Sequence, residues 1–254
     1  MPDSWAQAFK ETQAIIEQWH ETQKQFADIA QTIRDEWADL AKQNVITIDI
    51  QYDKLYLAAT KMGERGWTIP FELTLRNIYE LGDTELSEHD IDDAFFKFYV
   101  DNNKEEFSIL VNHIATSNLC SSWRELFKQC VKAYNDEQYL IVIPSLLTIL
   151  EGLLATLLSN KGKTKMADIC ISELGNYETD EGKFVNRMAW LSITSFIQNL
   201  YAGYPFSGDE PSRINRHWIL HGRSVVNWTS IDCLRLFNAI SSVISVLKHK
   251  ESPE

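Results

Sequence analysis

Residues 139–158 form an almost uninterrupted apolar run, which restricts the possible folds of this chain more than any other stretch. Twelve of its twenty residues are Leu, Ile or Val, and as a helix the run is long enough to span a bilayer. Its hydropathy alone therefore does not exclude a membrane. We favour a buried core helix, because the neighbouring amphipathic segments need an apolar partner. Small residues that let helices approach also recur along it: Ser145, Thr148, Gly152, Ala155 and Ser159.

The composition predicts an all-α fold around this helix. Glycine (10 residues) and proline (6 residues) are too few for a turn-rich β architecture. Apolar residues recur with helical spacing, and capping residues such as Ser87 and closing glycines such as Gly82 mark the ends. We expect helices at residues 45–65, 73–81, 87–100, 105–116, 121–134, 139–158, 164–174, 179–200 and 231–247.

Five acids between residues 85 and 93 could be read as a metal cluster. We interpret them as the solvated first turn of the helix capped by Ser87, because acidic side chains stabilise a helix N-terminus. These acids are Glu85, Glu88, Asp90, Asp92 and Asp93.

The segment from Ser4 to about Lys42 predicts one long helix with a coiled-coil seam. Its apolar residues follow alternating steps of three and four over five heptads, which is the 3.5-residue repeat of such a seam. At 1.5 Å per residue the helix would be roughly 55–60 Å long. We expect it to pack along another long helix, either of this chain or of a protein partner.

Charge is distributed unevenly along the chain. The net charge is -12, with 22 acidic and 10 basic residues in positions 1–110 and 14 of each in positions 111–254. We therefore expect an acidic helical region at residues 1–115 and a helical bundle at residues 116–254. The net charge argues against a large nucleic-acid footprint but leaves room for a local basic site.

The four cysteines and the N-terminal residues favour a cytoplasmic protein. Cys120, Cys130, Cys170 and Cys233 form no Cys-x-x-Cys pair and are typical of buried thiols in a reducing compartment. The first residues show no basic-plus-apolar signal peptide. We expect no membrane association.

Residues 212–223 form a basic segment that contains three arginines, two histidines and an asparagine but no acid. Imidazole titrates near neutral pH, whereas guanidinium stays charged, so the pair suits proton transfer beside a stabilised negative charge. Phosphoryl chemistry on RNA needs this combination.

Within this segment, Arg216, His217 and His221 resemble the motif of HEPN-domain ribonucleases. The family motif is an arginine, a polar residue, a few variable positions and a histidine, near the start of the last long helix of a small helical bundle. The resemblance covers residues 121–250 and implies a HEPN-like four-helix bundle at the C-terminal end of the chain. It also implies that Glu151, near the end of the apolar run, points toward the polar end of the bundle, beside arginine.

The resemblance implies a metal-independent endoribonuclease. The 2′-OH of RNA would attack the adjacent phosphate and leave a 2′,3′-cyclic phosphate. His221 would transfer the proton and Arg216 would bind the phosphate. Asn215, His217 and Arg223 are candidate substrate contacts, and no metal or cofactor is required. Members of the family commonly act as homodimers and serve as toxins or phage-defence effectors.

The spacing of the motif also favours a dimer. Five residues on a regular helix are about 140° apart, so Arg216 and His221 share one site if the helix is distorted or if two subunits contribute to it. His217 and His221, four residues apart, could hold a metal, but the sequence offers no obvious third ligand. They could also be structural side chains.

Two further functions stay open. In one, the protein is a non-catalytic interaction module that recruits a partner through its long N-terminal helix. In the other, the apolar run anchors a sensor in a membrane.

Overall fold

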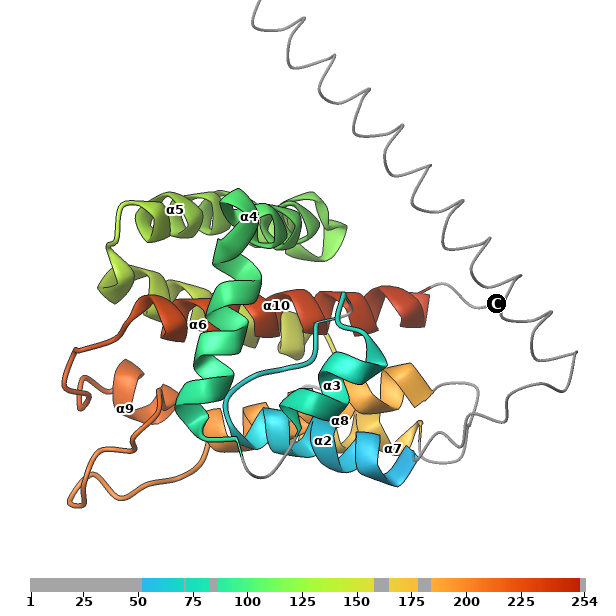
Figure 1. Ribbon diagram of the computed structural model, residues 1–254. Helices are drawn as coiled ribbons and strands as arrows, with labels where there is room; N and C mark the ends of the chain where they lie inside the picture. Colours follow the sequence, from blue (N-terminus) through green and yellow to red (C-terminus); the bar gives the residue numbers. More distant parts are fainter. Residues whose placement is uncertain (1–51, 71, 83–85, 158–164, 178–183, 252–254) are drawn as a thin grey trace, which may run out of the picture. The chain divides into compact units, whose positions relative to one another are not determined.

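A computed structural model describes residues 52–70, 72–82, 86–157, 165–177 and 184–251, and the secondary structure in these ranges is entirely helical (Figure 1). The predicted all-α class is confirmed for this part of the chain. Residues 51–254 form one compact unit. The heptad segment at residues 4–42 lies outside the described residues.

Helix α10 (Ser230–Glu251) is the centre of this unit. It packs against α4 (Glu88–Thr116), α6 (Tyr139–Ala155) and α8 (Phe184–Leu200), and Figure 1 shows it crossing the middle of the bundle in red. The ring of Phe237 contacts three aromatic rings from α4 and α5 (Arg124–Asn135). The apolar stripe of α10 is buried: Leu234, Phe237, Ile240, Ile244 and Leu247.

Among the described residues, the segment Ser230–Lys248 of α10 is the one helix whose length and apolar composition would allow it to cross a membrane. However, 78% of this segment is buried inside the bundle, as expected for the central helix of a packed core.

The apolar run forms α6, which ends at Ala155. Eight of its aliphatic side chains are buried, so the run supplies the core, as predicted. The small residues form the expected seam only in part, since Thr148 and Ala155 are exposed and Ser159 lies outside the described residues. Ser145 and Thr148 hydrogen-bond backbone oxygens of their own helix on its more exposed side. Gly152 does contact another element, because a Cβ there would lie 2.1 Å from the indole of Trp123.

Helix α4 joins two segments that the sequence analysis predicted as separate helices. Ser87 caps it by accepting from the backbone N–H of Asp90, as predicted. Asn103 and Lys104 both have positive φ, 57° and 62°, and this left-handed pair falls at the predicted break. The remaining elements are α2 (Tyr52–Glu64), α3 (Leu75–Leu81), the 3₁₀ helix η1 (Asn118–Trp123), α7 (Met166–Gly175) and α9 (Arg216–Leu220).

Helices α2–α4 belong to the same compact unit as α5–α10, on both sides of the expected boundary at residue 115. Asn238 of α10 accepts a hydrogen bond from the hydroxyl of Tyr99 and donates to the carbonyl oxygen of Thr68. Arg235 of α10 binds Asp92 of α4. Asp92 is therefore part of a nearly buried ion pair and not of a solvated helix start.

Candidate active site

Asn215 is the N-cap of helix α9, which begins at Arg216. Its Oδ1 accepts hydrogen bonds from the backbone N–H groups of His217 and Trp218, at 3.1 and 3.3 Å. Its Nδ2 donates to the carbonyl oxygen of Ala202 at 3.0 Å. Asn215 is only 2% exposed. The predicted direct contact with substrate does not fit this burial, and Asn215 instead positions the residues of α9.

Helix α9 ends in a left-handed turn at Gly222, where φ is 64°. The N–H of Gly222 donates to Ile219 O and the N–H of Arg223 to Trp218 O, which is the Schellman pattern. These bonds leave His221 at the exposed C-cap. The motif therefore lies on a short helix of its own, and the last long helix starts only at Ser230. The resemblance implied a motif near the start of that last helix.

Glu151 of α6 holds the side chain of Arg216. The Nε of Arg216 donates to Oε1 of Glu151 at 2.6 Å, with about a quarter of each side chain exposed. Glu151 was expected beside an arginine, and Arg216 is that arginine. In the described part of the chain only its Nε has a hydrogen-bond partner, so the two terminal nitrogens can bind an oxyanion.

A row of rings joins Arg216 to His221. The Cζ of Arg216 lies 6.0 Å from the centroid of the Tyr201 ring, and that centroid lies 6.3 Å from the ring of His217. The His217 ring stacks on that of His221 at 6.3 Å, with 10° between their planes. Among the described residues, the rings of Tyr201 and His217 thus link the two predicted catalytic residues.

Tyr201, the first residue after α8, was not among the predicted site residues. Burial, followed by the nearby Glu151 carboxylate, raises the pKa of Tyr201 well above its usual value, so the phenol stays protonated. The sequence gives little indication that Tyr201 belongs to the site, because Tyr201 is a single aromatic residue at the end of a helix with regular apolar spacing.

Phe206, in the loop between α8 and α9, was also missed. Phe206 is 43% exposed, and its ring lies 5.6 Å from the ring of His221. The guanidinium carbon of Arg223, a predicted substrate contact, lies 5.4 Å from the same ring. Phe206 thus brings His221 and Arg223 to one exposed surface.

Metal and thiol chemistry have little support in the described ranges. No group of three or more His, Cys, Asp and Glu side chains there is arranged to hold a metal ion. The four cysteines are buried, and burial raises the pKa of Cys130 to about 11 and that of Cys170 to about 12. These two thiols therefore stay protonated at neutral pH and are poor nucleophiles.

We expect Gly222→Ala to lower the free energy of unfolding by about 1 kcal/mol, because alanine tolerates a positive φ poorly. A Cβ at Gly222 would meet no atom within 4 Å, so the effect comes from the backbone alone. Urea unfolding measures the loss, and NMR shifts of His221 report its displacement. Gly203→Ala is the matched control, since that site is equally open and no positive φ is recorded there. Equal effects of the two variants would contradict this explanation.

No family model, no curated protein and no solved structure matches this chain. Its function therefore has to be inferred from the residues around α9.

Proposed function

We propose that this protein is a metal-independent endoribonuclease whose active site is built around α9. The main support is the arrangement of Arg216: Glu151 orients its guanidinium through Nε and leaves the terminal nitrogens available for a phosphate. An exposed imidazole, His221, ends the same short helix. The resemblance of residues 216–221 to the HEPN motif and the all-α class agree with this proposal.

In the proposed reaction, His221 acts first as a base and removes the proton of a ribose 2′-OH. The 2′ oxygen attacks the adjacent phosphorus, and the bond from phosphorus to the 5′ oxygen of the next nucleotide breaks. That 5′ oxygen takes up a proton from the protonated imidazole of His221. The products are a 2′,3′-cyclic phosphate and a 5′-OH. Arg216 stabilises the charge that builds on the phosphate oxygens during the attack.

We propose further that the active form is a homodimer in which Arg216 of one chain faces His221 of the other. In one chain the two residues are separated by Tyr201 and His217, so a two-fold axis beside α9 would bring them closer. Exposed apolar side chains lie next to the motif and would be buried in such an interface. They are Leu220 (41% exposed), Val225 (70%) and Val226 (53%).

The cellular role rests on the resemblance alone. We propose a cytoplasmic toxin or phage-defence effector that acts on RNA without a membrane, a cofactor or a metal. The residues at positions 1–50 carry the predicted heptad helix and are the candidate region for binding a regulatory protein.

The requirement for the 2′-OH tests the proposed reaction. We expect the protein to cleave an unstructured RNA and to leave unchanged the same strand with one 2′-deoxy substitution at the mapped cleavage position. Cleavage at other positions of the substituted strand is the internal control. Equal cleavage at the substituted position would show that water or another nucleophile attacks the phosphate.

A further inference from the structure

The exposed ring of Phe206 forms a flat surface beside the proposed catalytic histidine. His221 and Trp218 contact the ring in edge-to-face arrangements, at 5.6 and 5.8 Å. Arg223 places its guanidinium over the ring, and both Arg223 and His221 are exposed. An aromatic ring, a guanidinium and an imidazole therefore share one solvent-facing surface.

Internal hydrogen bonds fix the two segments that form this surface. The N–H of Gly208 donates to Pro205 O at 3.0 Å and closes a turn around Phe206. Glu210, at the end of that loop, accepts from the hydroxyl of Ser224 and, at 2.8 Å, from the N–H of Val225. Since Ser224 directly follows Arg223, these bonds tie the Phe206 loop to the Arg223 turn.

The chemistry of this surface favours an unpaired nucleotide. Bases stack on aromatic rings and on guanidinium planes, which is how proteins bind the unpaired bases of single-stranded nucleic acid. A paired base is already stacked in its duplex and cannot use the ring. An apolar protein partner would desolvate Arg223 and His221, whereas a nucleotide brings a phosphate for them to bind.

We propose that Phe206 and Arg223 form a base-binding subsite that places one unpaired nucleotide next to the phosphate cleaved at His221. This inference rests on the proposed function and names its substrate class as single-stranded RNA. Phe206 is a positioning residue in this scheme, because it touches the base and not the reacting atoms.

A fluorescent base tests the subsite without any cleavage. A set of 2′-O-methyl RNAs, which cannot react by 2′-OH attack, carries 2-aminopurine at successive positions. We expect strong quenching at one position, adjacent to the bond that the protein cleaves in ordinary RNA. Phe206→Leu should abolish that quenching and weaken binding about tenfold, as expected for one lost stacking contact. Phe206→Trp should preserve both.

Tyr204→Leu is the matched control, because Tyr204 is 44% exposed on the same loop. It should leave the quenching unchanged, and circular dichroism checks the folding of each variant. Phe206→Leu with unchanged quenching would overturn the subsite. A second pair of results would also overturn it: the wild-type protein shows no position-specific quenching, and Phe206→Leu converts a dimer to monomers. The ring would then belong to a protein interface.

The two proposals can fail separately. Position-specific quenching without cleavage of ordinary RNA would support the subsite and refute the ribonuclease. Cleavage without position-specific quenching would support the ribonuclease and refute the subsite.

Discussion

His221→Ala and Arg216→Ala should each lower the RNA cleavage rate by about 10²- to 10³-fold, while the helical circular-dichroism signal is retained. A positioned acid or base and a preorganised donor to the developing charge each contribute about this much. Arg216→Lys should recover little activity, because an ammonium lacks the planar pair of donors that binds two phosphate oxygens. Initial rates on a defined RNA measure all three variants.

The stability of the variants separates a catalytic role from a structural one. His221 is exposed at the end of α9, so its replacement should change the free energy of unfolding by less than about 0.5 kcal/mol. Arg216→Ala leaves the partly exposed Glu151 without its partner and should cost about 1 kcal/mol. Unfolding of both variants at room temperature would favour the interaction module, in which the basic segment only supports the fold.

Mixing the two inactive variants tests the composite site. If each site takes its arginine and histidine from different chains, half of the dimers in an equal mixture are hybrids with one intact site out of two. The mixture should then regain about a quarter of the wild-type rate. Recovery requires subunit exchange, so the mixture is first unfolded and refolded together. If rates stay at the level of the separate variants and His217→Ala is inactive, the site lies within one chain and uses His217.

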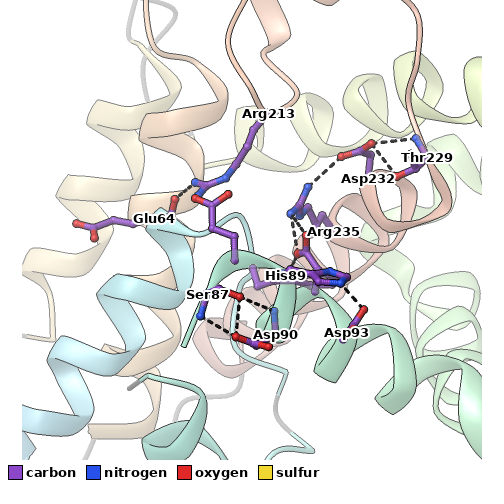
Figure 2. A network of polar contacts seen from close by, with 12 residues as sticks. Glu64, Ser87, His89, Asp90, Asp93, Arg213, Thr229, Asp232 and Arg235 are labelled. Carbon is purple, nitrogen blue, oxygen red and sulfur yellow. Dashed lines mark hydrogen bonds and ion pairs between the residues drawn. The ribbon is translucent and has the colours of Figure 1, made fainter. Parts of the chain in front are cut away.

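Asp92→Ala should cause the largest loss of stability, about 3 kcal/mol, because it leaves Arg235 with less charge compensation in the bundle. Both carboxylate oxygens of Asp92 accept from Nη2 of Arg235, at 2.7 and 2.8 Å, and one also accepts from the indole N–H of Trp67. The Arg235 side chain is only 8% exposed. Arg235 retains Asp232, a pair that Figure 2 shows, so the expected loss is at the lower end for a buried ion pair.

Asp93→Ala is the matched control for this loss. Asp93 is the next residue on α4, but its side chain is half exposed and pairs with His89 at 3.6 Å on the helix surface (Figure 2). Such a pair contributes about 0.5 kcal/mol or less. Urea unfolding compares the two variants at pH 7. Equal losses would show that the Arg235–Asp92 pair does not hold α4 on α10.

Much of the fold could be predicted because the local sequence signals, such as helix caps and apolar runs, agree with the burial seen in the structure. Ser87 caps α4 as its sequence signal indicates, and the aliphatic run forms the buried helix α6. The boundary expected at residue 115 rested on acidic composition, which describes the surface of α2–α4. Composition does not report the buried contacts that hold them, such as Thr68 and Tyr99 on Asn238.

The site was only partly predictable for a similar reason. The unusual composition of residues 212–223 identified the segment, and the resemblance to the HEPN family indicated Glu151. Asn215 fitted a binding role by its chemistry, but its position before Arg216 makes it a helix cap. Tyr201 and Phe206 lie outside any periodic pattern, so only the fold brings their rings to His217 and His221.

The end groups of RNA cleaved in excess EDTA test the central proposal most directly. A labelled RNA is incubated with purified protein, and the fragments are analysed by mass spectrometry, with the His221→Ala variant as the control for contaminating nucleases. The proposal predicts unchanged cleavage in EDTA, 2′,3′-cyclic phosphate and 5′-OH ends, and about 10²- to 10³-fold slower product formation by the variant. Cleavage that disappears in EDTA and returns with a divalent ion, or that leaves 5′-phosphate ends, would contradict it.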